Sequence, residues 1–370
     1  LKADRIIVGS WLDDDAGSGS GSAYIFRDSG SGFQEEVKLV ADDAVAGDSF
    51  GVSVSVNGDD AIVGAPYTTQ FGFQTGAAYI FHRGASGWAQ VIKLERGPNQ
   101  AGALFGNNVA ILGDVAVVSA PGDSFGGFSR GAVYVYRRTA GVWQFDRRLQ
   151  AADGADNDGF GAAMSLSGDS LLVGAYVADG PAGLDQGAAY VFRDGRAGWA
   201  QEAKLVASDA HATDLFGGGV ALNGDLAVAA AYMADLPGGT DQGAGYIFRR
   251  SGTLWTQIAK IRANDAGTSD ILGTAAAIDP QFVALGAMFS NTANTDAGEA
   301  YVFSIQTCSC YGNCDGSTLE PRLNVADYIC FMNAYAAGDA YANCDQSTLP
   351  PVLNVADYIC FMNQFAAGCQ

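Results

Sequence analysis

The sequence predicts an all-β fold, a β-propeller of four-stranded antiparallel blades, followed by a small α-helical domain. Three observations predict it. Glycine is abundant (50 of 370 residues), a unit of 55 or 56 residues recurs along residues 1–307, and all seven cysteines lie after that region. Four short strands per unit without a helical pattern are typical of propeller blades. A solenoid built of single-strand coils would use a shorter period.

Each unit contains four segments with the composition of strands. The first follows a Phe-Gly pair such as Phe50-Gly51, the second resembles Ile62–Pro66, and the third resembles Gly76–Phe81. The fourth runs from an aromatic residue to a basic-apolar pair, as in Trp88–Leu94. These segments are rich in Val, Ile, Tyr and Phe and are bounded by Gly, Asn or Asp, as strands are. Asn57-Gly58 and its counterparts separate the first and second strands, where a tight hairpin requires positive φ.

The strand types are unequally represented. The second and third occur six times, but the first and fourth only five. We therefore predict six blades over residues 1–306, with the first blade incomplete at its N-terminal end. Roughly 20–30 residues before Leu1 would complete blades one and six, because an open ring leaves unpaired strand edges. Seven blades become the better count if a full unit precedes Leu1, and a strand supplied by a neighbouring molecule would produce a filament or array.

The Phe-Gly strand followed by the Val63–Pro66 segment resembles the FG-GAP repeat of integrin α-chain heads and of many bacterial surface proteins. The resemblance covers about 300 residues and implies a propeller that recognises a ligand or a protein. Integrin-type blades often carry an Asp-x-Asp-x-Asp-Gly calcium loop between their first two strands. Here that loop is only Asn57-Gly58-Asp59 and its equivalents, so we expect no calcium in the blades.

Two aspartates recur seven and two residues before the Phe-Gly position in four of five units. They are Asp43/Asp48, Asp153/Asp158, Asp209/Asp214 and Asp265/Asp270. We interpret them as turn caps, because aspartate side chains commonly hold loop amides. Metal binding is the alternative interpretation.

The loops between the second and third strands differ most from blade to blade, as recognition loops on a rigid scaffold do. They combine acidic residues with nearby aromatic residues. The set comprises Asp13, Asp14, Asp15, Asp123, Asp179, Asp185, Asp235, Asp241 and Asp296, with Trp11, Tyr67, Tyr176, Tyr232 and Phe289. This combination suits a carbohydrate, a cation or a basic protein patch, and solvated loop charge is the alternative.

Several function classes are disfavoured. The formal charge of −20 argues against nucleic acid and anionic membrane surfaces as partners, and no apolar stretch approaches the ~18 residues of a membrane span. We also predict no enzymatic activity, because the two histidines, His82 and His211, lie in inter-strand loops outside any nucleophile motif. Carboxylate pairs can serve a glycosidase, so a polysaccharide-acting enzyme is a third candidate function.

Residues 307–370 predict a calcium-binding module. The stretch 323–333 recurs unchanged at 353–363, and each copy carries Asn and Asp two apart, then Asn and Asp three apart, before a predicted helix. Hard oxygen donors at such spacing surround Ca²⁺ in EF-hand-like loops. Helix capping by Asp327 and Asp357 alone would leave Asn313 and Asp315 unexplained.

This module resembles a bacterial dockerin of the type that ends on Gly-Cys, here Gly368-Cys369. The resemblance implies Ca²⁺ as cofactor and a cohesin-like or other surface protein as partner. The implied ligands are Asn313, Asp315, Asn324 and Asp327 in one copy and Asn343, Asp345, Asn354 and Asp357 in the other, with Asp339 as a further candidate. Extra residues that include Pro321 and Pro350-Pro351 lengthen both loops relative to the ordinary form.

The cysteines indicate an exported protein, secreted or at the cell surface, because cysteine-dense small modules belong in oxidising surroundings. Disulfides within each copy are favoured, Cys314–Cys330 and Cys344–Cys360, with Cys369 joined to Cys308 or Cys310. Cross-pairing between the copies is the alternative. We therefore expect a binding or scaffold protein, with self-assembly into an extracellular filament or sheath as the second hypothesis.

Overall fold

The computed structural model describes residues 4–70, 72–97, 101–125, 127–290 and 297–305, together with Met332. The chain divides into two compact units, Leu1–Ser304 and Ile305–Gln370. The first unit is a six-bladed β-propeller of antiparallel sheets, which confirms the predicted fold class. The predicted dockerin-like domain lies outside the described residues except for Met332. No helix among the described residues combines the length and apolar character that crossing a membrane requires.

Blades two to five each contain four strands in sequence order. Blade two comprises β4 (Ser53–Asn57), β5 (Asp60–Ala65), β8 (Ala77–Gly84) and β9 (Gly87–Leu94). Blade three comprises β10 (Val109–Leu112), β11 (Val115–Ala120), β12 (Ala132–Thr139) and β13 (Val142–Leu149). Blade four comprises β14 (Ala163–Ser167), β15 (Ser170–Ala175), β16 (Ala188–Gly195) and β17 (Gly198–Leu205), and blade five β18 (Phe216–Asn223), β19 (Leu226–Ala231), β20 (Ala244–Ser251) and β21 (Leu254–Ile261).

The first and last blades have three described strands each. Blade one comprises β1 (Arg5–Ser10), β2 (Ser22–Asp28) and β3 (Phe33–Leu39), and blade six β22 (Leu272–Ile278), β23 (Phe282–Ala287) and β24 (Glu299–Ser304). Among the described residues, blade one has no first strand and blade six no fourth, in agreement with the unequal strand count of the sequence. A short hairpin, β6 (Thr69–Gln70) with β7 (Phe73–Gln74), extends the loop between β5 and β8.

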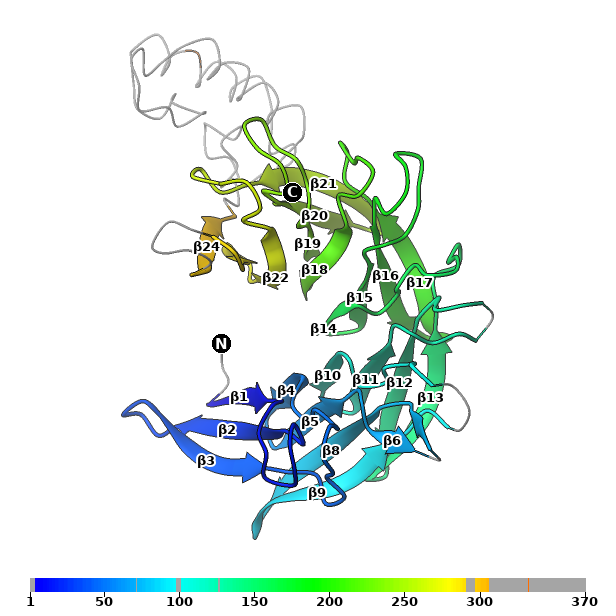
Figure 1. The fold of residues 1–370 in the computed structure, drawn as a ribbon, viewed down its shortest axis with the longest axis vertical. Helices are drawn as coiled ribbons and strands as arrows, with labels where there is room; N and C mark the ends of the chain where they lie inside the picture. Colours follow the sequence, from blue (N-terminus) through cyan, green and yellow to red (C-terminus); the bar gives the residue numbers. More distant parts are fainter. Residues whose placement is uncertain are drawn as a thin grey trace. The chain divides into compact units, whose positions relative to one another are not determined.

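The first strands of blades two to six lie innermost and next to one another (Figure 1). Small polar side chains join them. Ser53 Oγ on β4 accepts a hydrogen bond from Val109 N on β10 at 3.0 Å. Ser165 Oγ on β14 likewise accepts one from Leu222 N on β18 at 3.0 Å. These bonds satisfy backbone amides that would otherwise be unpaired at the inner sheet edge.

The Phe-Gly pair joins each blade to the one before it. Phe105 is fully buried, and its N donates to Thr75 O of blade two at 3.0 Å. Gly106 has φ of 94°, which favours glycine, and its N donates to Ser119 O at 2.9 Å. A Cβ on Gly64 of blade two would lie 1.9 Å from Gly106 O. The close approach of the next blade's Phe-Gly loop therefore favours glycine at residue 64, whereas Ser119 and Ala230 occupy the equivalent position in blades three and five.

The hydrophobic core lies between neighbouring blades rather than inside one blade. One cluster joins Ile62, Ile80 and Leu94 of blade two with Phe105 and Tyr136 of blade three. Similar clusters occupy the following interfaces. Each sheet of blades two to five thus buries both of its faces, which accounts for second and third strands that are largely apolar along their length.

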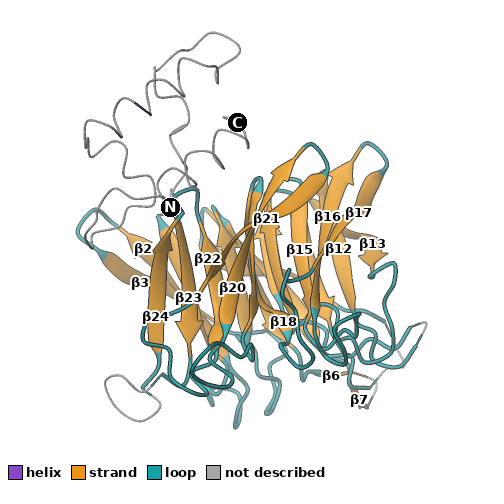
Figure 2. Ribbon diagram, turned by 90° about the horizontal axis from the view of Figure 1, so that it is seen from above, coloured by secondary structure: helices purple, strands orange, loops and turns teal. Residues whose placement is uncertain are grey.

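The two ends of the blades differ in their connections. The loops between second and third strands, and those that lead from one blade to the next, gather at one end, and tight hairpins occupy the other (Figure 2). The hairpins between first and second strands carry glycines with positive φ, as predicted; they are Gly58, Gly113, Gly168 and Gly224. We call the end with the long loops the Phe-Gly face and the opposite end the hairpin face.

Candidate functional site

The Phe-Gly face carries aromatic side chains from every blade. They follow the second strand directly or stand in the loop after it, and comprise Trp11, Tyr67, Phe125, Phe128, Tyr176, Tyr232 and Phe289. All except Tyr176 and Tyr232 are exposed. The structure therefore places the predicted aromatic residues at one end of the propeller. Phe125 and Phe128 were not predicted.

Tyr176 and Tyr232 are brought together. Their ring centroids are 6.3 Å apart and the rings are tilted by 40°. Both follow the second strands of adjacent blades, so the spacing of the blades sets the distance between the rings. Burial raises the pKa of Tyr232, and the phenol of that residue therefore stays neutral at physiological pH.

These two tyrosines belong to a pocket of about 490 Å³, here called the central pocket. It is bounded by blades three, four and five, and its lining residues are Gly102, Leu104, Asn107, Pro121, Gly122, Ser129, Asn157, Gly159, Ala162, Tyr176, Val177, Gly218 and Tyr232. The volume falls within the range of small-molecule sites, ~300–1,000 Å³. Asn107 and its equivalents Ala162 and Gly218 directly follow the Phe-Gly pair, at a position that varies between blades and was not predicted.

The predicted acidic residues of blades one and three are engaged in ion pairs. Asp13 lies 2.9 Å from Lys38 Nζ, and Asp15 contacts the same ammonium group. Hydrogen bonds from Lys38 and Ser22 lower the pKa of Asp13, although burial opposes them. Asp14 instead accepts a hydrogen bond from Gly19 N at 2.7 Å. These three carboxylates therefore already have partners within the propeller.

Asp123 is fully buried. Its carboxylate lies 3.0 Å from Arg96 Nε and 3.2 Å from Arg148, and it accepts a hydrogen bond from the Tyr134 hydroxyl. Burial alone would raise the pKa of Asp123, but the hydroxyl of Tyr134, the amide of Phe125 and the two guanidinium groups hold it below its usual value. This aspartate holds the third blade together rather than facing a ligand.

In blades four and five the aspartates shape their own loops. Asp179 accepts a hydrogen bond from Asp185 N at 2.9 Å, and Asp235 accepts one from Asp241 N at 2.9 Å. Asp185 and Asp241 have positive φ, which such capping stabilises. Asp296 lies outside the described residues.

The recurrent aspartates before the Phe-Gly position have two different roles, so the capping interpretation is correct for only one of each pair. The second member caps: Asp48, Asp158, Asp214 and Asp270 accept backbone hydrogen bonds from the residue three positions earlier, at 3.0, 2.7, 2.8 and 2.6 Å. Burial raises the pKa of Asp48, Asp158 and Asp214.

The first member of the pair joins blades. Asp43, Asp153 and Asp209 lie 2.7, 2.6 and 2.7 Å from Lys93, Lys204 and Lys260 on the fourth strand of the next blade. Burial would raise the pKa of each aspartate, but the lysine outweighs it and the pKa is lowered. Among the described residues no three metal-ligating side chains form a group that would hold an ion.

His82 lies within β8, not in a loop as the sequence suggested, and its Nδ1 is 2.8 Å from Asp60 Oδ1. The backbone N of His211 donates a hydrogen bond to the buried carboxylate of Asp214 at 2.8 Å. The two histidines belong to different blades, so they do not form a shared site.

The predicted metal ligands and cysteines lie outside the described residues. They are Asn313, Asp315, Asn324, Asp327, Asp339, Asn343, Asp345, Asn354 and Asp357, and Cys308, Cys310, Cys314, Cys330, Cys344, Cys360 and Cys369. The calcium and disulfide assignments therefore stay predictions.

Sheets that are joined through Phe-Gly pairs and carry variable loops on one face define a repeat-built recognition propeller. The model of the FG-GAP repeat matches residues 1–26, 33–81, 88–136, 143–192, 199–248 and 255–303, and the chain belongs to this family. Each full match begins at the fourth strand of one blade and ends in the third strand of the next, so every repeat joins two blades. A comparison with curated proteins finds no match.

Proposed function

We propose that this protein is an exported, non-catalytic recognition protein. The propeller binds a ligand at its Phe-Gly face, and the C-terminal module attaches the protein to a cell surface or an assembly. The observation that supports recognition is the set of aromatic side chains on the Phe-Gly face, one or more from every blade, two of which line the central pocket. Exposed apolar side chains that rigid strands hold on one face are typical of binding sites. FG-GAP repeats are typical of extracellular and surface proteins, which supports the same role.

The recognition role is tested with the double variant Trp11→Ser, Phe289→Ser. Binding of the full chain to bacterial surface polysaccharide and surface protein fractions is measured by biolayer interferometry. We expect at least about tenfold weaker binding, as for exposed aromatic anchors of an interface. Leu254→Ser on the hairpin face is the control, because Leu254 is also exposed. Equal loss in both variants, or none in either, would contradict a site on the Phe-Gly face.

The attachment role rests on the C-terminal repeats. Their carboxylate and amide oxygens suit Ca²⁺, a hard cation that prefers oxygen ligands. Bound Ca²⁺ would order the two loops so that the following helices present a docking surface for a cohesin-like protein. Isothermal titration of the full chain with Ca²⁺ tests this proposal. We expect two ions to bind, and the double variant Asp315→Asn, Asp345→Asn to bind neither tightly; absence of binding in the unaltered chain would refute the calcium module.

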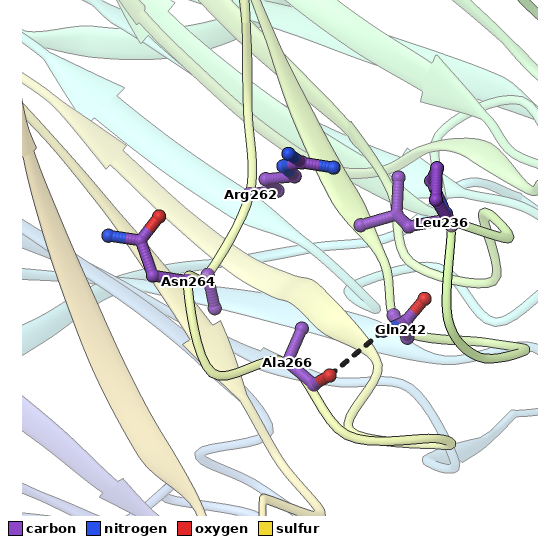
Figure 3. A pocket seen from close by; sticks show the side chains of 7 residues that line it. Leu236, Gln242, Arg262, Asn264 and Ala266 are labelled. Atoms are coloured by element: carbon purple, nitrogen blue, oxygen red, sulfur yellow. Dashed lines mark hydrogen bonds between the residues drawn. The ribbon is translucent and has the colours of Figure 1, made fainter.

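A second candidate function is assembly through the β24 edge of blade six, with which no strand among the described residues pairs. A groove of about 660 Å³ borders that edge, lined by residues 260–265 and by Tyr301, Val302 and Phe303. A smaller cavity of about 190 Å³ adjoins it, where the Gln242 amide donates to Ala266 O at 2.8 Å beside Arg262 and Asn264 (Figure 3). Unpaired strand edges of this kind are templates for added strands.

The complete blades indicate what an added strand must carry. In blade five, Gln257 Oε1 accepts a hydrogen bond from Ser208 N at 3.0 Å, and Lys260 pairs with Asp209. Asn264 and Asp265 occupy the equivalent positions before blade six. A strand with Gln and Lys three residues apart would therefore fit the groove, and a neighbouring molecule that supplies it would extend a filament.

Electron microscopy and light scattering of the full chain test assembly. A filament built through this edge should disappear in Val302→Glu, which adds a charge to the groove, and on addition of a peptide with the sequence of residues 198–205. A monodisperse monomer at high protein concentration would contradict assembly while leaving the recognition proposal intact.

A further inference from the structure

The central pocket offers hydrogen-bonding side chains without internal partners. Within the described part of the chain, the side chains of Asn107, Ser129, Asn157, Tyr176 and Tyr232 neither donate nor accept a hydrogen bond. Polar side chains that converge on a pocket with such free capacity fix the orientation of a ligand. The amides and hydroxyls together supply both donors and acceptors.

The same pocket carries two aromatic rings beside these polar groups. Tyr176 and Tyr232 stand 6.3 Å apart, and Leu104 and Val177 extend the apolar part of the lining. An aromatic face binds a flat apolar surface, whereas the amides bind groups at its rim. The complementary ligand therefore has an apolar face and polar edges.

Charge decides between the ligand classes that the sequence left open. None of the thirteen lining residues is acidic or basic, although the chain has a formal charge of −20. In the loops of the blades that bound the pocket, Asp123 is paired with Arg96 and Arg148, and Asp179 and Asp235 accept hydrogen bonds from loop amides. A cation or a basic protein segment would bury its charge here without a counter-charge, which is costly.

We infer that the central pocket binds a neutral saccharide, with a pyranose ring against Tyr176 or Tyr232 and its hydroxyls bonded to Asn107, Ser129 and Asn157. A sugar ring has an apolar face of C–H groups and a rim of uncharged hydroxyls, which matches this lining. The inference rests on the proposed recognition function and specifies its ligand class.

The test uses the full chain on an array of neutral and charged glycans, followed by titration calorimetry with the best neutral glycan. We expect Tyr176→Ala and Tyr232→Ala each to weaken binding by about tenfold, as the loss of a ring contact does. Phe282→Ala, an exposed aromatic residue on the hairpin face, is the matched control and should bind like the unaltered chain. Tyr232→Phe removes only the hydroxyl and keeps the ring. Binding close to that of the unaltered chain would show that the ring face, and not the hydroxyl, makes the contact.

Asn107→Asp distinguishes a neutral ligand from a cationic one, because it adds a charge with almost no change in shape. A neutral glycan should bind this variant less tightly, by a factor of about three to ten. Tighter binding of a cationic ligand by Asn107→Asp would overturn the saccharide assignment.

The saccharide assignment and the recognition function fail separately. One outcome is that the chain binds no glycan but does bind a surface protein, and that the Trp11→Ser, Phe289→Ser variant no longer binds that protein. This outcome would overturn the saccharide assignment and support the recognition function. No binding of either class at the Phe-Gly face would overturn both.

Discussion

The middle and end blades share one sequence pattern but differ in their surroundings. Val191 of blade four is fully buried, whereas Val302 at the equivalent position of blade six is 66% exposed. On the other side, Val63 of blade two is buried and its equivalent in blade one, Val8, is 48% exposed. A blade of this propeller is therefore not a self-contained unit. Its apolar faces are complementary to a neighbour on each side, and each end blade has one such face that no described blade covers.

The Phe-Gly contact and the ion pairs follow the same rule. Gly174 of blade four is closely approached by blade five, whereas Gly286 of blade six has only ordinary neighbours. Asp209 has Lys260 opposite it, whereas Asp265 forms no ion pair among the described residues. The difference between complete and incomplete blades can be tested position by position, because the repeats supply matched pairs.

The largest difference in the free energy of unfolding is expected between the variants Val191→Asp and Val302→Asp. The first places a carboxylate in a filled interface and should cost about 4 kcal/mol or more. The second places it at an exposed position and should change the free energy of unfolding by less than about 0.5 kcal/mol. Urea unfolding of the two variants measures both. A large cost at Val302 would show that another segment covers blade six in solution.

A smaller difference is expected for Gly174→Ala against Gly286→Ala. The new methyl at residue 174 would lie 1.9 Å from Gly217 O, so the Phe-Gly loop of blade five must shift, at a cost of about 1–3 kcal/mol. At residue 286 the nearest atom is 3.5 Å away, and little change is expected. Thermal unfolding compares the pair, and equal destabilisation would argue that close approach does not require glycine at this position.

The smallest effect concerns the Asp209–Lys260 pair, which is partly exposed and should contribute less than about 1 kcal/mol. Because the pKa of Asp209 is lowered, the stabilisation is complete above the unfolded value of ~3.9 and is lost as pH falls through the folded pKa. Lys260→Met should remove this part of the pH dependence, measured by unfolding at pH 7 and pH 3. Asp265→Asn, which removes the carboxylate at the equivalent position without an ion pair among the described residues, is the matched control.

Much of the fold was predictable because every repeat carries the same pattern of strand and turn residues. The strand types, the positive-φ hairpin glycines such as Gly58 and the missing strands of the end blades all follow from local sequence. The roles of Asp43 and Asp48 were not separable in this way. They recur with the same spacing, yet Asp48 reaches a local amide and Asp43 reaches Lys93 of another blade. Only the second contact depends on how blades pack.

The candidate site likewise has features that were predictable from the sequence and features that depend on how the blades pack. The aromatic positions after the second strands were predictable from the sequence, including Tyr176 and Tyr232. Their pairing, and the convergence of Asn107 and Asn157 on them, depend on the angle between neighbouring blades. The aspartates looked equally available in sequence, but in the structure Asp13 pairs with Lys38 and Asp123 pairs with Arg96 and Arg148.

The local sequence specifies the blades, because strand period, turn glycines and the Phe-Gly pair act within a few residues of one another. Tertiary structure decided which apolar faces are covered, which carboxylates are neutralised and which tyrosines form a pocket. The reason is physical: burial, ion pairing and ring contacts depend on atoms from separate blades, and repeated segments with the same local pattern acquire different neighbours according to their place in the series.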